Sequence, residues 1–230
     1  MDFVYICRDG DNEELRYSIR SVIHSFPEAN IWIVGGKPKW YSGNHIEVKQ
    51  NSVKYKNAVS NLLAICNSEE ITDKFILMND DFFIIKKISN IGVFHGGLLS
   101  KKIEEYQILS RSSNYINKLL MTDRKLKKHR IENALDYELH VPMVMQKAAL
   151  ADILLRYPQY LWRSMYGNLI NVGGIEIKDV KIHKTKSSRM SLKDISEDSS
   201  FLSTADDSFK FVLENGLQQM FSNKTKFEQD

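Results

Sequence analysis

Cysteine and proline are scarce in this chain of 230 residues, which contains two cysteines and four prolines. Cys7 lies inside an apolar run and Cys66 near the end of a helical pattern. This spacing excludes a disulfide framework and a cysteine-based zinc site. We therefore expect a protein of a reducing compartment, the cytoplasm.

Long hydrophobic runs are also absent. No segment approaches the roughly 18 uninterrupted apolar residues that a membrane-spanning helix requires. The first eight residues lack the basic start and the apolar length of a signal peptide. The sequence therefore predicts neither a transmembrane segment nor a signal peptide.

A charge excess of one sign is missing as well. Thirty-two Lys and Arg against 29 Asp and Glu give a net charge of +3, and the pI is about 8.7. This balance excludes a surface coated for nucleic acid but is compatible with an anionic ligand. The composition, 43% hydrophobic and 27% charged, is that of a globular protein. At roughly 150 residues per domain, we expect one elaborated domain over residues 1–230.

The first hundred residues alternate between two patterns. Apolar runs typical of buried strands occupy residues 3–7, 31–34 and 74–78, with a weaker one at 46–48. Apolar residues at three- and four-residue steps indicate helices over 15–26 and 58–65. Strands alternating with helices predict an α/β fold, a Rossmann-like, mostly parallel sheet flanked by helices.

The later residues divide into four segments. Residues 101–165 are mainly helical in pattern and predict a helical insertion. Apolar and polar residues alternate at 175–182, which predicts a strand returning to the sheet. Residues 184–200 have the composition of a loop, and 206–221 predict a final helix.

Polar and glycine residues follow three of the predicted strands. The first strand ends in Arg8-Asp9-Gly10, the second in Gly35-Gly36, and the strand at 74–78 in Asn79-Asp80-Asp81. Ligands of open parallel sheets bind beyond the carboxyl ends of the strands. We therefore expect the functional site at this edge.

Two adjacent carboxylates at the end of a buried strand repel each other unless a cation compensates them. Hard oxygen ligands suit Mg²⁺ or Mn²⁺. Since side chains alternate along an extended chain, we expect Asp81 with Asn79 or Asp80 to hold the ion. His183, at the end of the late strand, is a further candidate ligand or a phosphate partner. An Asp-rich turn that caps a helix is the alternative interpretation.

A candidate general base and candidate phosphate clamps lie later in the chain. His140 precedes Val141-Pro142, whose proline fixes an extended backbone; a buried structural histidine is the alternative. Arg156 and Arg163 are candidate clamps for a diphosphate, or else surface ion-pair partners. The basic run at 124–130 indicates either a solvated helix face or a patch for an acidic polymer.

Taken in order, four blocks of the sequence resemble the stealth family of sugar-phosphate transferases. They are residues 2–10; residues 15–21 with 31–34 and 75–83; residues 140–142 with 156–158 and 163–164; and residues 206–207 with 221–228. The first block departs from the family pattern at Ile6, Cys7 and Arg8. The compact chain is similar to a bacterial or phage-type member.

The resemblance implies a GT-A-like α/β core, a divalent metal and a nucleotide-diphosphosugar donor, expected to be a UDP-sugar. By position it implies a set of site residues, which we list by expected role. The catalytic residues are Asp80, His140, Arg163 and Asp207, the donor-binding residues are Tyr5, Arg8, Asp9, Gly10, Arg16, Gly35 and Gly36, and the metal ligands are Asp81, Asn79 and His183.

We accordingly expect a metal-dependent transferase that moves a sugar or sugar-1-phosphate to an acceptor hydroxyl. Residues 1–100 would bind the nucleotide, 101–165 form the insertion and 166–230 contribute the acceptor side. The acceptor would be a glycan, another polymer or a nucleic acid. One alternative is a plain glycosyltransferase acting on a cell-surface glycan or on hydroxylated nucleic-acid bases. The other is a non-catalytic carbohydrate- or nucleic-acid-binding module.

Overall fold

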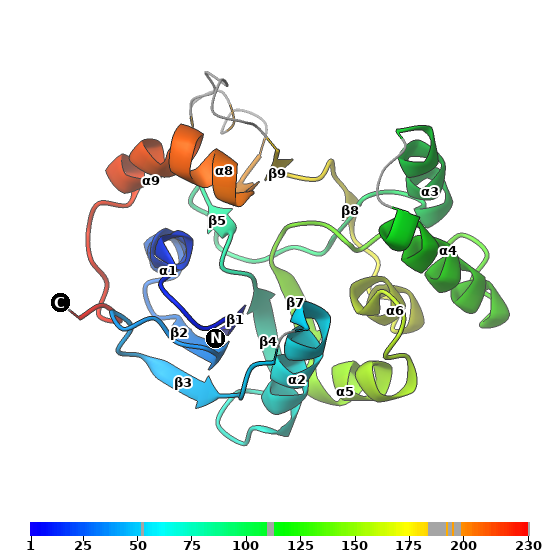
Figure 1. Ribbon diagram of the computed structural model, residues 1–230, viewed down its shortest axis with the longest axis horizontal. Coiled ribbons are helices and arrows are strands. Elements are labelled where there is room, and N and C mark those ends of the chain that lie inside the picture. The colour runs from blue at the N-terminus through cyan, green and yellow to red at the C-terminus, as the bar shows by residue number, and fades with distance from the viewer. Residues whose placement is uncertain (52, 110–112, 184–191, 193–194, 196–198, 230) are drawn as a thin grey trace. The chain divides into compact units, whose positions relative to one another are not determined.

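The computed structural model describes residues 1–51, 53–109, 113–183, 192, 195 and 199–229 (Figure 1). They form two compact units. Unit 1 comprises residues 1–91, 140–145 and 180–230, and unit 2 comprises residues 92–139 and 146–179. In the described part of the chain, no helix combines the length and the apolar character that crossing a bilayer demands.

A five-stranded sheet with the strand order β3-β2-β1-β4-β7 forms the centre of unit 1. β1 (Asp2–Cys7) pairs in parallel with both β2 (Asn30–Gly35) and β4 (Lys74–Met78). β2 in turn pairs in parallel with β3 (Asn44–Glu47), and β7 (Met143–Gln146) lies beside β4. The interior of β1, β2 and β4 is buried because helices cover the sheet. The predicted α/β class with a mostly parallel sheet is confirmed.

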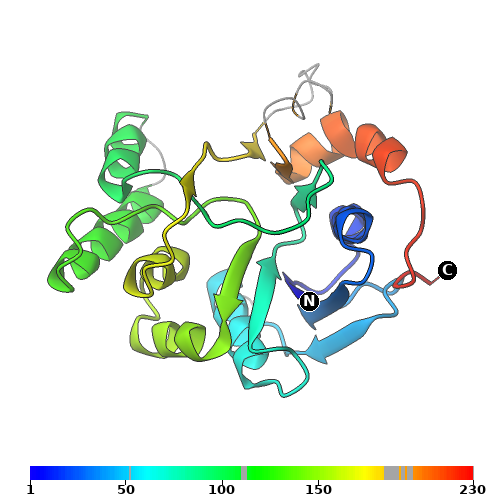
Figure 2. The same cartoon turned by 180° about the vertical axis from the view of Figure 1, so that it is seen from behind.

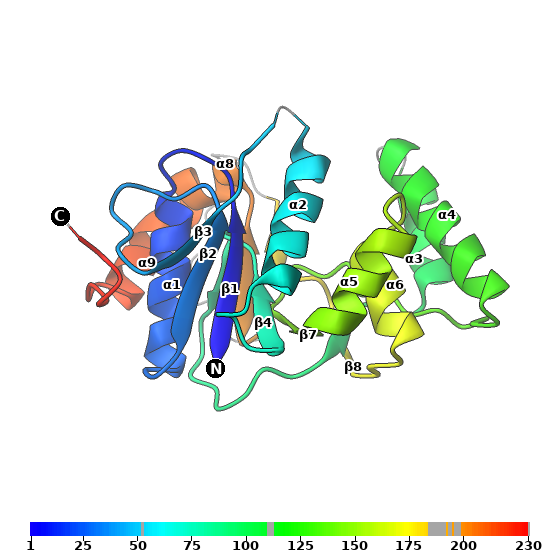
Figure 3. The ribbon, with the colours of Figure 1, turned by 90° about the horizontal axis from the view of Figure 1, so that it is seen from below.

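Helices α1 (Glu13–Ser25) and α2 (Lys54–Asn67) lie on opposite sides of this sheet (Figure 3). Helix α1 begins directly beyond the carboxyl end of β1, where the Asn12 side chain accepts a hydrogen bond from the amide of Leu15 at 2.9 Å. This cap satisfies one of the free amides of the first turn. The edge at which β1 ends therefore carries a fixed helix start.

A second core of unit 1 lies between α1 and the C-terminal helices. β5 (Phe82–Ile84) pairs antiparallel with β10 (Phe201–Thr204), which pairs in parallel with β9 (Lys181–Ile182). α8 (Asp206–Ser208), the π-helix η1 (Phe209–Leu213) and α9 (Glu214–Met220) follow β10 (Figure 2). Apolar side chains fill the space, among them Phe83, Leu202, Phe209, Leu213 and Leu217.

The last described residues, 221–229, form a segment that we call the C-terminal strap. The amide of Ser42 donates to the carbonyl of Phe227 at 2.9 Å, and the amide of Gln229 donates to the carbonyl of Trp40 at 2.8 Å. Glu228 accepts two hydrogen bonds from the Arg20 guanidinium, at 2.9 and 2.6 Å. The strap thereby joins α1 to the chain between β2 and β3.

Unit 2 is built mainly from helices. They are α3 (Leu99–Ile108), α4 (Ser113–Lys128), α5 (Lys147–Arg156) and α6 (Trp162–Leu169), accompanied by paired short strands β6 (Phe94–His95) and β8 (Ile175–Glu176). The Asn168 side chain makes two hydrogen bonds of 2.8 Å with the backbone of Leu135. This amide fixes the loop before residue 140 onto α6.

One expectation was wrong. The mainly helical pattern is interrupted near residues 139–142, and the strand β7, which the sequence did not predict, follows there because it pairs with β4. The strand expected over 175–182 consists of β8 and β9, which pair with β6 and β10 and do not join the central sheet. Most of the loop expected at 184–200 lies outside the described residues.

Candidate active site

The chain ends of β1 and β2 meet in close backbone contact. The amide of Gly36 donates to the carbonyl of Cys7 at 3.1 Å. A Cβ atom at position 36 would lie 2.3 Å from the Asp9 nitrogen, and Gly35 has a φ of +109°. Only glycine fits both positions. Arg8, Asp9 and Gly10 consequently form an exposed backbone ledge at the edge of the sheet.

The acidic turn after β4, Asn79-Asp80-Asp81, is held by three other segments. Asp80 accepts a hydrogen bond of 2.6 Å from the side chain of Asn12, the residue that caps α1. Asp81 accepts two hydrogen bonds at the same oxygen, Oδ2: one from the Lys181 ammonium at 2.7 Å and one from the Ser203 hydroxyl at 2.9 Å. The acidic turn is therefore fixed to α1, β9 and β10.

The environment of Asp80 is electrostatically unusual. Burial raises the pKa of its carboxyl above the ordinary value, and the neighbouring Asp81 charge raises it further. Asn12 and the Arg8 guanidinium act in the opposite direction and lower this pKa. Arg8 on the ledge is thus near enough to Asp80 for their charges to interact, which makes the ledge and the acidic turn one electrostatic site.

His140 lies beside the same turn. Its half-buried ring makes an edge-on contact with the ring of Phe82, the residue after Asp81, with 6.3 Å between the centroids. Asp207 is exposed on the short helix that follows β10, the strand whose Ser203 contacts Asp81. Unit 1 therefore contains most of the predicted catalytic residues, in segments that adjoin the acidic turn.

The residues present fit a partly hydrated divalent ion better than an ion held by protein alone. Among the described residues, no three His, Cys, Asp or Glu side chains form a metal-binding group, so His183 does not join the two aspartates in one. Mg²⁺ usually needs only one or two carboxylates, with water and phosphate oxygens completing its shell. Asp81 with Asp80 or Asn79 meets this smaller requirement if Lys181 yields Oδ2.

Three predicted site residues lie elsewhere. The Tyr5 ring is fully buried, and its hydroxyl is bonded to Ser18 at 2.9 Å, so the expectation of a donor contact through this side chain was wrong. Arg16 pairs with Glu13 at 2.9 Å and Glu228 at 3.1 Å. Arg163 belongs to unit 2, where it is buried and donates to the carbonyl of Tyr137 at 3.1 Å.

Sequence reasoning missed Lys181, Ser203 and Asn12 as partners of the acidic turn. Lys181 and Ser203 face each other in the register between β9 and β10. Both are at least 100 positions from Asp81 along the chain, so no local pattern links them to it. The available signal was Asn12, a helix-capping residue type that lies between Asp9-Gly10 and the helix predicted over 15–26.

No protein-family model matches the chain, and no curated protein matches it. Two solved structures similar to it are crystal structures of the galactosyltransferase LgtC. One, a complex with donor and acceptor sugar analogs, has 10% sequence identity and a TM-score of 0.47, covering 98% of this chain and 97% of the other. The second, an active-site mutant of LgtC, has 10% identity, a TM-score of 0.49 and the same coverage.

Proposed function

We propose that this chain is a transferase that moves a sugar or a sugar-1-phosphate from a nucleotide-diphosphosugar to an acceptor hydroxyl. One observation carries the proposal: the glycine-lined ledge after β1 and β2 and the acidic turn after β4 share one edge of a parallel sheet and interact electrostatically. Such an edge is where open α/β sheets bind nucleotides.

The ledge would bind the nucleotide of the donor. Asp9 and Gly10 are exposed, and Gly35 and Gly36 allow the ends of β1 and β2 to pack in close backbone contact beneath them. Arg8 contributes a cation suited to a diphosphate. Donor binding there places the diphosphate next to Asp80 and Asp81.

Asp81, with Asp80 or Asn79, would hold Mg²⁺ or Mn²⁺. Such an ion, when bound, neutralises the charge that develops on the leaving phosphate. Lys181 already supplies one positive charge at Asp81. His140 is proposed as the base that removes the proton from the acceptor hydroxyl, and Asp207 as a residue that positions the reactants.

Donor turnover tests the proposal. A panel of UDP-, GDP- and CDP-sugars is incubated with the protein and Mn²⁺, and nucleotide release to water is followed by chromatography. We expect release from at least one donor, and its loss in Asp81→Ala and in the isosteric Asp81→Asn. Glu69→Ala, an exposed acid outside the ledge and the acidic turn, is the matched control and should keep the wild-type rate. Absence of release and of donor-induced thermal stabilisation would favour a non-catalytic binding module.

The nucleotide that leaves identifies the bond that is made. In sugar-phosphate transfer, proposed from the stealth resemblance, the acceptor oxygen attacks the sugar-bearing phosphorus and a nucleoside monophosphate leaves. In plain glycosyl transfer it attacks the anomeric carbon, and the nucleoside diphosphate leaves. Accumulation of the diphosphate, with no monophosphate formed directly, would contradict phosphate transfer and leave a glycosyltransferase at the same site.

A further inference from the structure

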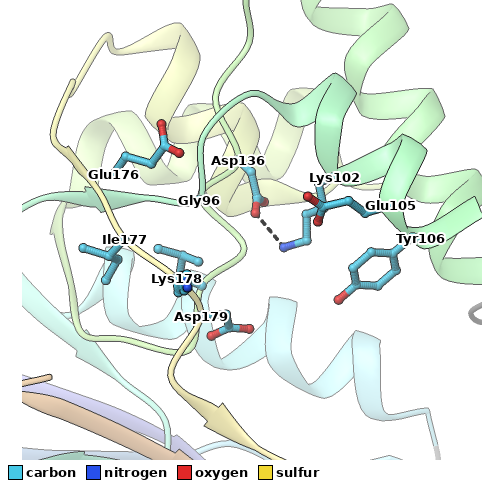
Figure 4. Close-up of a pocket in the computed structure, with 10 residues that line it drawn as sticks. Gly96, Lys102, Glu105, Tyr106, Asp136, Glu176, Ile177, Lys178 and Asp179 are labelled. Atoms are coloured by element: carbon cyan, nitrogen blue, oxygen red, sulfur yellow. Dashed lines mark hydrogen bonds and ion pairs between the residues drawn. The ribbon is translucent and has the colours of Figure 1, made fainter. Parts of the chain in front are cut away.

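Unit 2 contains a cavity that the proposed donor site does not use. Its volume is about 400 Å³, within the range of roughly 300–1,000 Å³ typical of small-ligand sites. The lining comes from one face of α3, the loop around Asp136, and residues 176–179 after β8 (Figure 4). All of these segments belong to unit 2.

Helix α3 presents three polar side chains to the cavity. Lys102, Glu105 and Tyr106 are spaced three and four residues apart and therefore share one helix face. The Lys102 ammonium contacts Asp136 Oδ2 at 2.6 Å, and both side chains are almost fully buried. Burial lowers the pKa of Lys102, but the charge of Asp136 and its hydrogen bond outweigh burial and raise it, so Lys102 keeps its positive charge at neutral pH. A fixed ion pair thus lies at the wall of the cavity.

The position of Gly96 keeps this wall accessible. A Cβ atom at residue 96 would lie 2.7 Å from Asp136 Oδ2 and 3.3 Å from a Leu139 methyl group. Any larger residue would displace the carboxylate that holds Lys102. In Figure 4 the side chains of Lys102, Tyr106, Asp136 and Asp179 surround one space.

The lining selects against several ligand classes. It carries four carboxylates and two lysines, so the excess negative charge repels phosphates and nucleotides. Lys102 and Lys178 offset half of the carboxylate charge, which weakens the attraction of the lining for a simple cation. A neutral molecule with many hydroxyl groups suits the lining best, since carboxylates accept from hydroxyls, ammonium groups donate to them, and Tyr106 offers an aromatic face.

We propose that this cavity binds a sugar ring of the acceptor, with Asp179 and Glu105 accepting hydrogen bonds from its hydroxyls and Tyr106 packing against its apolar face. This inference rests on the proposed transferase function and specifies its acceptor as a carbohydrate. Unit 2 would thus bind the acceptor sugar, whereas the residues that we propose to bind the donor lie in unit 1.

Saturation-transfer difference NMR tests the cavity with methyl glycosides of glucose, galactose and N-acetylglucosamine. We expect saturation of at least one glycoside by the wild-type protein. Asp179→Asn should weaken its binding about tenfold or more, as expected when a hydrogen bond to a charged group is lost. Tyr106→Ala should also weaken it, because the aromatic contact with the sugar face is removed. Glu104→Gln, an exposed neighbour on α3 that does not line the cavity, should bind within about twofold of wild type.

Donor release to water, measured on the same samples, separates this proposal from the proposed function. Unchanged release in Asp179→Asn together with lost glycoside binding supports the cavity as the acceptor site. Donor release by a wild-type protein that saturates no glycoside, or glycoside binding that none of the cavity variants alters, overturns it. Displacement of a bound glycoside by trilysine would show a cation site and also overturn it. Glycoside binding through the cavity without any donor release supports the sugar site and overturns the transferase.

Discussion

Asp81 accepts hydrogen bonds from Lys181 and Ser203 through a single oxygen, Oδ2. A divalent ion bound at Oδ2 would compete with the Lys181 ammonium for the lone pairs of this oxygen, and the lysine charge would repel an ion at either oxygen. We therefore predict that Lys181→Met, which keeps the length of the aliphatic stem and removes the charge, binds Mn²⁺ more tightly than wild type. Isothermal titration calorimetry of the two proteins with Mn²⁺ alone measures the difference.

Lys74→Met is the matched control, because Lys74 is exposed at the start of β4. Its Mn²⁺ affinity should equal that of wild type. If Lys181→Met and Lys74→Met bind Mn²⁺ equally, Asp81 is not a metal ligand, and Lys181 is the resident cation of the acidic turn.

We propose His140 as the base next to the acidic turn, where its ring contacts the ring of Phe82. Removing a general base lowers the rate of the chemical step by about 10²- to 10⁴-fold. We predict a loss of this size for His140→Ala, with donor affinity little changed. Initial rates combined with donor titration calorimetry separate the two quantities, and His24→Ala, an exposed histidine on α1, is the control. A proportionate loss of donor affinity would instead make His140 a nucleotide contact.

For individual residues, the sequence predicted which acids and glycines lie at the sheet edge, because each directly follows an apolar strand. It did not predict the partner of Asp81, since Lys181 is 100 positions away and reaches it only through the pairing of β9 with β10. The prediction that Tyr5 binds the donor was wrong for a related reason. Strand periodicity does not show that the ring turns into the core to reach Ser18.

The C-terminal strap depends on one carboxylate. Burial alone would raise the pKa of Glu228, but hydrogen bonds from Arg20, the Thr225 amide and Arg16 outweigh burial and lower it. Its contribution to stability is therefore present above pH 4.5, its ordinary pKa, and is lost as the pH falls through the lowered value.

We predict that Glu228→Ala destabilises the protein by about 3 kcal/mol or more at pH 7, because it leaves the buried Arg20 without its partner. Urea denaturation measures the change, and Glu69→Ala should stay within about 0.5 kcal/mol of wild type. The deficit of Glu228→Ala should shrink at pH 3. A deficit that does not depend on pH would show that packing, and not the ion pairs, holds the strap.

Among the secondary-structure elements, long regular patterns were predicted well and short ones poorly. β1, β2 and β4 are continuous apolar runs, and α1 has a regular helical spacing and a cap. β7 has only four residues between helical segments, and β8 and β9 have two each. Elements this short owe their conformation to partners far away in the chain, which a local pattern does not contain.

Across the whole molecule, the two units give stability two separate pH responses. Glu138 in unit 2 is half-buried and accepts hydrogen bonds from the amide and hydroxyl of Ser164, at 2.9 and 3.0 Å. Burial raises the pKa of its carboxyl, and the Asp136 charge raises it further. The ionised form is thus disfavoured in the folded state, so stability falls as the pH rises from 4.5, the ordinary pKa of the group, through the raised value.

We predict that Glu138→Gln, which keeps an acceptor for Ser164, raises the melting temperature at pH 8 and that this gain disappears near pH 4.5. A gain of 1 kcal/mol corresponds to roughly 2–4 °C for a protein of this size. Calorimetric scans across pH measure it, and hydrogen exchange should place the added protection in unit 2. An equal gain at both pH values would contradict a charge effect.

The division into units also governs the order in which the sheet becomes complete during synthesis. Unit 1 draws its residues from three separate stretches, and β7 is the last strand of the central sheet to be made. Until residues 143–146 leave the ribosome, β4 has an unpaired edge of backbone amides and carbonyls, which invites pairing with other chains. The acidic turn at the end of β4 gains its partners even later, because Lys181 and Ser203 are synthesised at least a hundred residues after Asp81. At roughly 5–20 residues per second, the nascent chain therefore carries the open edge and the uncompensated aspartates for several seconds, the period in which a chaperone would protect it.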